Sequence, residues 1–250
     1  MSSASGTRPF LLISTRDDPT AAEDEVRGFL SAGRLSPADL VVHALDASPL
    51  PAELDLEDYA GILLGGGPFN SSDDPARKST TQLRVESELS ALLDRIVEAD
   101  FPFLGACYGV GTLGVHQGGM VDRTHGEPVG TARIELTDAG AADPLAAGLP
   151  RTFDAFVGHK EAISQLPGRA VLLATSATCP VQMFRIGANL YATQFHPELD
   201  GDGLATRIAV YRDAGYFPPE AAGELTDLAH AADVSHAATV LRNFVARYRR

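Results

Sequence analysis

Residues 101–110 read FPFLGACYGV, and this stretch decides the fold that the sequence predicts. Residues 101–106 form a short, mostly apolar run, which is typical of a strand buried on both faces of a sheet. Gly105 and Gly109 lie two positions before and two positions after Cys107. This spacing is typical of a sharp turn from a strand into a helix, where small flanking residues let the two elements approach. The stretch therefore predicts a strand, a tight turn that carries a cysteine, and a helix.

Alternating strands and helices extend from this stretch towards the N-terminus. Short apolar runs predict a strand buried on both faces at residues 9–14 and two more short strands at residues 40–44 and 61–64. Asp18 is expected to cap a helix that Gly33 ends, and an apolar stripe along residues 85–96 predicts a second helix. This alternation indicates an α/β fold, in which helices cover both faces of a central, mostly parallel sheet.

The pattern changes after residue 130. Short strands separated by glycine, proline and aspartate are predicted at residues 132–136, 152–157, 170–175, 180–185 and 190–195. They indicate an antiparallel portion added to the main sheet. Helices are predicted at residues 204–214, 218–231 and 233–249. We therefore expect residues 1–8 to be a flexible N-terminus, residues 9–200 to form one α/β domain, and residues 201–250 to form a helical C-terminal extension packed on it.

Charge and hydropathy exclude several classes of function. The chain of 250 residues carries 20 Lys and Arg against 33 Asp and Glu, for a net charge of −13. A nucleic-acid backbone would be repelled, so we expect no nucleic-acid partner. The sequence has no apolar run of the roughly 18 residues that a membrane helix needs, and the start MSSASGTRPF has no apolar signal core. We expect a soluble, cytoplasmic protein, with the acidic run Glu23-Asp24-Glu25 on a solvated helix face.

Two cysteines, Cys107 and Cys179, are too few for a disulfide framework and lack the paired spacing of a zinc site. The pairs His125 with Glu127 and His159 with Glu161 have no third ligand at a suitable spacing, so we expect no metal and no cofactor. Cys179 is expected to be an inert, buried residue. The aromatic residues near the C-terminus fit a core, a lid or a dimer surface.

Cys107 is the candidate nucleophile. A thiol at the N-terminus of a helix lies near the positive end of the helix dipole, which is expected to lower its pKa and favour the thiolate. The alternative is a buried structural cysteine in a glycine-rich helix start. Residues 63–68, LLGGGP, follow another strand, and glycine backbone there could direct N–H groups at a developing oxyanion or simply form a tight turn.

His196 and Glu198 are the candidate partners of Cys107. They lie at the end of a predicted strand in the segment QFHPE, residues 194–198. Residues two apart in an extended chain point to the same side, and Pro197 between them restricts the backbone. A cysteine nucleophile needs a base, and the base needs an acceptor that orients its other ring nitrogen. Because strands of an α/β sheet end at one rim, the sequence predicts a Cys-His-Glu triad.

At this point the sequence resembles the class I (triad-type) glutamine amidotransferase family, most closely the amidotransferase domain of GMP synthase and its stand-alone relatives. The resemblance rests on LLGGGPFN, FPFLGACYGVGTLGVHQGG, EPVG, DPLAAGLP, VGHKEAI and ATQFHPELD, in the family's order. It implies a flavodoxin-like fold and hydrolysis of glutamine to glutamate and ammonia through a thioester on Cys107. His196 would be the base and then the acid, and Glu198 would orient it.

The resemblance also implies binding roles for backbone and loop residues. The N–H groups of Gly67 and Tyr108 would form the oxyanion hole. Gly66 would contact the substrate, and the segment Gly158-His159-Lys160 would lie along the amino-acid end of the substrate. One position departs from the family. The usual Gly-x-Cys-x-Gly-x-Gln pattern has its final glutamine replaced by Gly111, which removes a contact to the substrate amide. Either the change opens room for a larger γ-glutamyl compound, or another residue such as Tyr108 binds glutamine instead.

Three functions therefore remain open. The first, which the motifs favour, is a glutaminase whose ammonia goes to a separate synthetase subunit or is released. The second is a γ-glutamyl peptidase or hydrolase that uses the same triad. The third is a non-catalytic binding or regulatory module of the same fold. A small-molecule substrate is expected in the first two cases, and a homodimer remains open in all three.

Overall fold

The computed structural model describes residues 7–249, so most of the predicted flexible N-terminus lies outside the described residues. The strands are β1 (Phe10–Ser14), β2 (Leu40–Ala44), β3 (Gly61–Leu64), β4 (Phe103–Ala106), β5 (Met120–Asp122), β6 (Glu127–Leu136), β7 (Thr152–His159), β8 (Ala162–Gln165), β9 (Val171–Thr175), β10 (Met183–Ile186) and β11 (Leu190–Thr193). The α-helices are α1 (Pro19–Gly33), α2 (Thr80–Glu98), α3 (Tyr108–His116), α4 (Asp138–Ala141), α5 (Gly201–Val210), α6 (Ala222–Ala231) and α7 (Ala238–Tyr248).

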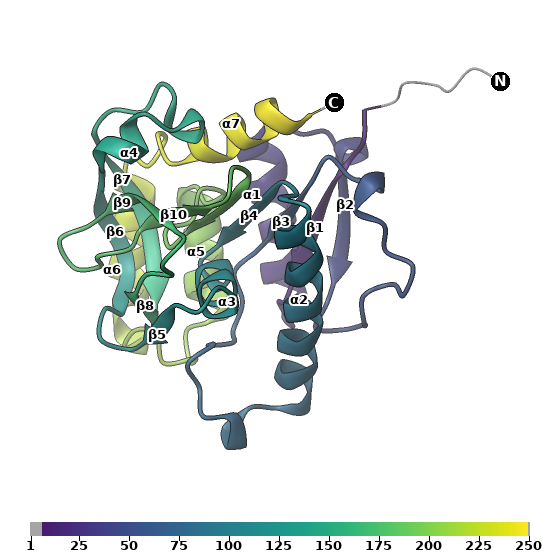
Figure 1. Ribbon diagram of the computed structural model, residues 1–250. Helices are drawn as coiled ribbons and strands as arrows, with labels where there is room; N and C mark the ends of the chain where they lie inside the picture. The colour runs from purple at the N-terminus through teal and green to yellow at the C-terminus, as the bar shows by residue number, and fades with distance from the viewer. Residues whose placement is uncertain (1–6, 250) are drawn as a thin grey trace.

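A single large sheet organises the chain (Figure 1). Its strand order is β2-β1-β3-β4-β11-β10-β9-β6-β7. The pairs from β2 to β11 are parallel, and the pairs from β11 to β7 are antiparallel. The predicted α/β class and the predicted antiparallel addition are therefore both confirmed.

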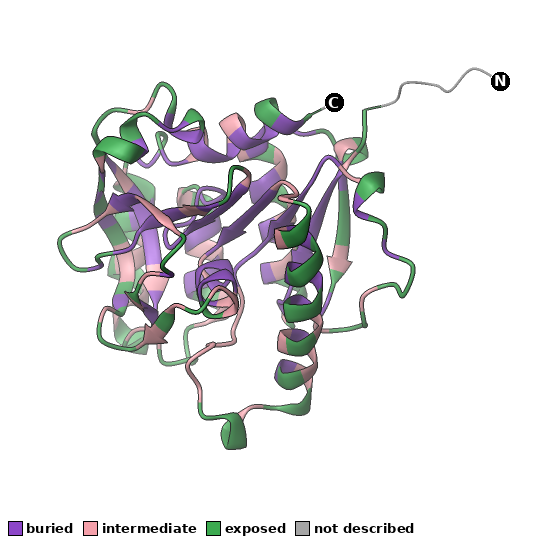
Figure 2. Ribbon diagram, in the orientation of Figure 1, coloured by how far each residue is buried: buried purple, intermediate pink, exposed green. Residues whose placement is uncertain are grey.

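Alternate residues of the central strands build two apolar layers. In β1, Phe10 and Leu12 join the layer that includes Phe244 of α7, whereas Leu11 and Ile13 join the layer that holds the inner side of α2. Successive strand residues point to opposite faces, so a strand that is apolar throughout can be buried on both. Figure 2 shows buried strands between helices whose outer sides are exposed.

The structure adds two strands and shortens three helices relative to the sequence predictions. β5 and β8 pair with each other in a separate two-stranded sheet. α5 begins at Gly201 because the Asp200 side chain accepts a hydrogen bond from the Gly203 N–H, and it ends at Val210. The remaining two C-terminal helices begin later than predicted, at Ala222 and Ala238.

Helix α1 begins and ends as predicted, but the residue that caps its C-terminus is not a glycine. Asp18 caps it by accepting from the Ala21 N–H. The left-handed residue that terminates the helix is Arg34, with φ 52°, rather than Gly33, which is the last helical residue. The acidic run is also not fully solvated, because Glu25 is completely buried and Asp24 is 9% exposed. The side chain of Glu25 therefore needs a buried partner, which the candidate active site supplies.

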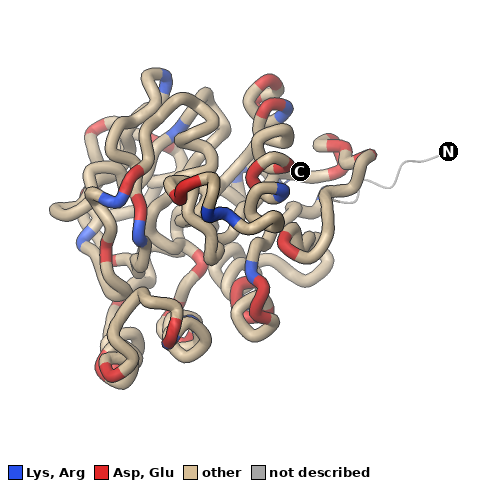
Figure 3. The backbone as a smooth tube through the Cα atoms, turned by 90° about the horizontal axis from the view of Figure 1, so that it is seen from below, with Lys and Arg blue, Asp and Glu red and all other residues tan. Residues whose placement is uncertain are grey.

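Surface charge agrees with the acidic composition. Aspartate and glutamate are spread over many separate helices and loops (Figure 3). Among residues 7–249, no helix is long and apolar enough to cross a membrane.

Candidate active site

Cys107 lies in a strained turn between β4 and α3. Its backbone has φ 53° and ψ −88°, an arrangement that a non-glycine residue rarely adopts. The Cys107 N–H donates to the Thr193 carbonyl of β11 at 2.7 Å, which holds the turn against the neighbouring strand. A Cβ at Gly105 would lie 2.8 Å from the Gly109 Cα, so strand and helix approach too closely there for any side chain. This is the geometry that the sequence pattern predicts.

The pKa of the Cys107 thiol is raised, not lowered as the helix dipole alone predicts. Burial raises the pKa of the Cys107 thiol to about 12, because a thiolate would lose its contact with water. Arg16 and Arg207 oppose this rise, while Glu198 and Glu161 add to it. The expectation of a lowered thiol pKa is therefore wrong, and the thiol must be deprotonated by a nearby base when it reacts.

His196 and Glu198 form a buried pair directly after β11. The His196 Nδ1 and the Glu198 Oε1 are 2.8 Å apart, and both residues are buried. Burial lowers the pKa of His196, and the nearby Arg207 and Arg16 lower it further, against the effect of Glu198. Burial opposes the charge on Glu198, but His196 and Arg207 together hold its pKa below the ordinary range. The pair is thus a neutral imidazole oriented by a carboxylate.

Helix α1 packs directly on this pair. A Cβ at Gly28 would lie 2.7 Å from the Glu198 carbonyl oxygen and 3.5 Å from its Cγ. A glycine at this position lets the helix reach the backbone that carries the carboxylate.

Gly66 lies where the cysteine and the histidine meet. A Cβ on Gly66 would be 3.1 Å from the His196 Cε1 and 3.8 Å from the Cys107 Cβ. Within residues 7–249, no hydrogen bond joins the Cys107 sulfur to the His196 ring, although both line one pocket. Catalytic hydrogen bonds are often long in an unliganded site and tighten when substrate binds. The fold therefore brings the three predicted triad residues to one end of the sheet.

Gly67 and Tyr108 line the same pocket as Cys107. A Cβ on Gly67 would collide with the Thr15 Oγ1, so this backbone is held tightly against the loop after β1. The ring of Tyr108 is buried edge-on against Phe69, with a centroid separation of 6.1 Å. The oxyanion role of the two N–H groups stays a prediction.

The three residues predicted at the amino-acid end of the substrate, Gly158, His159 and Lys160, also line the pocket. Gly158 packs against Val129, and a Cβ on Gly158 would lie 3.0 Å from the Val129 Cγ2. His159 is buried, and its Nε2 lies 2.8 Å from the Glu127 Oε2. Its Nδ1 lies 2.8 Å from the Glu161 carbonyl oxygen, so both ring nitrogens face oxygen acceptors. Substrate contact by these residues stays a prediction.

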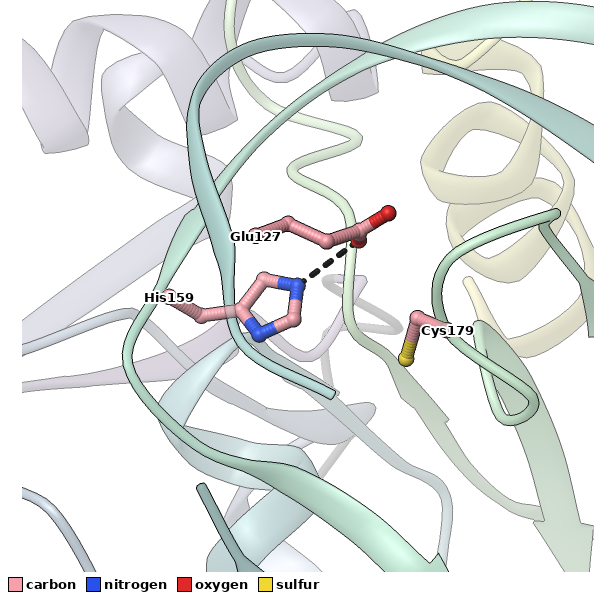
Figure 4. Close-up of side chains that lie close together, drawn as sticks. All are labelled: Glu127, His159 and Cys179. Atoms are coloured by element: carbon pink, nitrogen blue, oxygen red, sulfur yellow. Dashed lines mark hydrogen bonds and ion pairs between the residues drawn. The ribbon is translucent and has the colours of Figure 1, made fainter. Parts of the chain in front are cut away.

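Cys179 lies close to Glu127 and His159 (Figure 4). The three ligand atoms are all within 4.8 Å of one another. Sequence spacing could not find this third residue, because the fold brings it from a distant loop. The Glu127 carboxylate already accepts hydrogen bonds from Gln182 and Thr178 and pairs with His159. This carboxylate is thus held by protein donors in a network that joins the loop between β9 and β10 to the end of β7, and the absence of a metal stays a prediction.

Glu161 occupies the space beside Gly111. A Cβ on Gly111 would lie 2.7 Å from the Ser71 Oγ and 3.0 Å from the Glu161 Oε1. The two Glu161 oxygens accept from the backbone N–H groups of Ser71 and Ser72, each at 2.7 Å. The replacement of the family's glutamine by glycine therefore does not leave open room. The loop after β3 and an acidic side chain fill that space.

Two buried arginines are functional candidates that the sequence analysis missed. The Arg207 Nη1 lies 3.0 Å from the His196 Nδ1, and its Nη2 donates to the Glu198 Oε1 at 3.0 Å. The Arg16 Nε donates to the Glu25 Oε1 at 2.8 Å. Arg16 directly follows the carboxyl end of the first strand, and this position is the signal that could have identified it. Arg207 lies within a helix, where no local pattern points to the triad.

The chain matches the sequence model of a known protein family. The family model described as "Glutamine amidotransferase class-I" matches residues 30–208. The chain belongs to the class I glutamine amidotransferase family. Among curated relatives of this amidotransferase-family chain, the GMP synthase [glutamine-hydrolyzing] of Thermosipho africanus is 30% identical over 151 residues, which cover 60% of this chain and 26% of the relative. The same enzyme of an Enterobacter species is 31% identical over 149 residues, with 56% and 25% covered.

Solved structures of similar chains agree on the class I glutamine amidotransferase fold. A glutamine amidotransferase from Thermotoga maritima superposes with a TM-score of 0.73 at 20% identity, covering 96% of this chain and 98% of that chain. A glutamine amidotransferase from Methylobacillus flagellatus gives a TM-score of 0.74 at 21% identity, with 98% and 96% covered. Unlike the GMP synthases, these structures match this chain along nearly its whole length, including the C-terminal helices.

Proposed function

We propose that this chain hydrolyses the side-chain amide of a γ-glutamyl compound, glutamine in the simplest case, through a thioester on Cys107. The observation that supports this most is the convergence of Cys107, in its strained turn, with the paired His196 and Glu198 beside Gly66. A decayed enzyme would be expected to lose its thiol or its base first, and both are present. This argues against a non-catalytic binding or regulatory module.

The first half of the reaction forms the thioester. The neutral His196 Nε2 takes the thiol proton as the Cys107 sulfur attacks the amide carbon, and the carbonyl oxygen becomes an oxyanion. The N–H groups of Gly67 and Tyr108 donate to that oxyanion. The carbon–nitrogen bond then breaks, and the imidazolium gives its proton to the departing nitrogen. Glu198 stabilises the transient imidazolium and keeps the ring oriented.

The second half of the reaction releases glutamate. Water enters where the amine has left, and His196 takes one of its protons as the oxygen attacks the thioester carbon. The carbon–sulfur bond breaks, and the proton returns to the Cys107 sulfur. The products are glutamate and ammonia, or glutamate and an amine when the amide nitrogen is substituted.

The experiment is turnover by the purified chain. Glutamine and γ-glutamyl amides are incubated with the protein, and glutamate and the released nitrogen compound are assayed. We expect turnover, together with covalent labelling of Cys107 by a glutamine-like chloroketone. Absence of turnover of every substrate, with Cys107 unlabelled, would contradict the proposal.

The ammonia or amine that the proposed reaction releases can pass to a second protein or leave as a free product. The chain spans about a quarter of the length of the GMP synthases that it matches. Where glutamine is the substrate, we propose that the ammonia is used by a separate synthetase subunit in the cytoplasm. Copurification of an ATP-dependent synthetase that accepts ammonia supports this, and free release of a substituted amine as the favoured reaction supports a γ-glutamyl hydrolase instead.

A further inference from the structure

Arg16 is a buried cation with one unused donor group. It is 6% exposed, its Nε donates to Glu25, and its Nη1 donates to the Tyr211 hydroxyl at 3.0 Å. The Nη2 has no hydrogen-bond partner among residues 7–249. Arg16 lines the candidate active-site pocket, and its Nη2 is not among the buried polar atoms that lack a partner, so this nitrogen is open to the pocket. A bound ligand can therefore supply the acceptor for this charged donor.

The free nitrogen lies beside the reacting groups, on the His196 side. The Cβ position at Gly66 is 2.8 Å from the Arg16 Nη2 and 3.1 Å from the His196 Cε1. In the proposed reaction, His196 protonates the departing nitrogen, so the substituent on that nitrogen must pass next to this ring. A negative group on the substituent would come within reach of Arg16.

The wall beyond Arg16 is aromatic and apolar. The Tyr211 ring lies 5.8 Å from the guanidinium carbon of Arg16. Lys160 holds the same segment, because its Nζ donates to the Ala214 carbonyl at 2.9 Å and lies 4.1 Å from the centre of the Tyr216 ring. The C-terminal extension contributes to the pocket lining Leu204, Ile208, Tyr211, Tyr216 and Phe217. Such a wall favours an apolar or aromatic group next to the carboxylate.

We propose that Arg16 binds a carboxylate carried by the leaving amine, and that the substrate class of this site is a γ-glutamyl amino acid with an apolar or aromatic side chain. The inference rests on the proposed hydrolysis at Cys107. One water is consumed, the γ-glutamyl carbon–nitrogen bond breaks, and the nitrogen leaves as a free amino acid that carries the proton from His196. The carboxylate accepts from the Arg16 Nη2 throughout and takes no part in bond making.

The test compares two substrates that differ in one charge. These are γ-glutamylphenylalanine and γ-glutamylphenylalaninamide, in which a neutral carboxamide replaces the carboxylate. We expect kcat/KM for the acid to exceed that for the carboxamide by about 10- to 100-fold, as a charge-assisted hydrogen bond in a buried site gives. Arg16→Gln should bring this ratio close to one, and Arg16→Lys should keep part of it.

The ratio contains its own control, because lower thiol reactivity or partial unfolding affects both substrates equally. Arg133→Gln is the matched surface control, since Arg133 lies on β6, is exposed and pairs with Asp154. It should leave the ratio unchanged. Should Arg16→Gln not fold, calorimetry on Cys107→Ala still decides, with the acid expected to bind about 10-fold more tightly than the carboxamide.

The inference would be overturned by a ratio near one in the unmodified chain, by an equal loss for both substrates in Arg16→Gln, or by equal affinities in Cys107→Ala. Turnover of glutamine with neither γ-glutamylphenylalanine compound cleaved would overturn it and leave the proposed function intact. No turnover of any substrate with Cys107 unlabelled would overturn both.

Discussion

Cys107, His196 and Glu198 have unequal roles in the proposed reaction, and substitution should separate them. Cys107→Ala removes the atom that forms the thioester and should lower kcat by about 10⁶, as should His196→Ala. Glu198→Ala should lower kcat by about 10⁴, because an orienting carboxylate is less essential than the nucleophile. Steady-state glutamate release checks these values. Equal losses for Glu198→Ala and Cys107→Ala would show that the carboxylate does more than orient the imidazole.

The raised pKa of Cys107 makes a prediction about pH. With a pKa of about 12, the thiol is protonated in the free protein at neutral pH, so its alkylation by iodoacetamide should keep rising through pH 9. The lowered pKa of His196 keeps the imidazole neutral below its ordinary pKa of about 6.5. Turnover should therefore hold at pH 6 although alkylation is slow there.

Peptide mapping measures alkylation of Cys107 separately from that of Cys179. An alkylation rate that levels off below pH 8 would mean that the free protein already holds the thiolate. In that case the helix N-terminus and the nearby arginines outweigh burial.

Replacing Gly111 by a residue with a side chain, including the family's glutamine, should destabilise the protein. Gly111→Ala places a Cβ against the Ser71 Oγ and the Glu161 Oε1, so we expect a loss of about 1–3 kcal/mol in the free energy of unfolding. Gly111→Gln should cost more and should lower turnover, since it displaces the loop that Glu161 holds. Gly168→Ala, with no atom within 4 Å of its Cβ position, is the control and should change stability by less than about 0.5 kcal/mol. Urea unfolding measures both.

For individual residues, the sequence predicts the Cys-His-Glu triad but not the side chains that surround it. Cys107, His196 and Glu198 were found because a tight turn and a strand end leave local patterns. Arg16 and Glu161 were missed because their roles come from contacts across the chain, with Glu25 and with the backbone of residues 71 and 72. The sequence around a single charged residue after a strand does not indicate which residue that side chain will contact.

Substitutions at the two ends of helix α1 should change the free energy of unfolding in opposite directions. Asp18→Ala removes the cap on the Ala21 N–H and should cost about 1 kcal/mol. Arg34→Gly relieves a left-handed backbone at φ 52° and should gain up to about 1 kcal/mol. Glu23→Ala, on the exposed face, is the control. Urea midpoints check all three, and a destabilising Arg34→Gly would show that the arginine side chain matters more than its backbone strain.

Strands were easier to predict than helix ends. The parallel strands are mostly apolar, and their bounds agree with the sequence to within two residues. Gly33 ends α1 as predicted, whereas the left-handed position that follows falls on Arg34, which no local pattern indicates. β5 and β8 were missed because they are short and pair only with each other.

The C-terminal extension belongs to the same core as the first strand. Phe244 of α7 is fully buried, 6.0 Å from the Phe10 ring and 4.8 Å from the Tyr248 ring. Arg207 of α5 contacts the triad. We propose that residues 9–200 and residues 201–250 unfold as one unit, even though the boundary marks a change from strands to helices.

Phe244→Ala tests whether the two parts of the chain unfold together. It should lower the free energy of unfolding by about 3–5 kcal/mol, while a single transition persists. Leu228→Ala on α6, where the side chain is 39% exposed, is the matched control and should have little effect. A chain that ends at residue 200 should not unfold cooperatively. Two separate transitions, or a truncated chain with a sharp melt, would show that the extension is a distinct unit.

The contact between Gly28 and Glu198 links helix α1 to the candidate active site. The helix lies behind the carboxylate, at an approach too close for a side chain on Gly28. A larger residue at position 28 would therefore push on the backbone that carries Glu198, from a helix that does not line the candidate pocket.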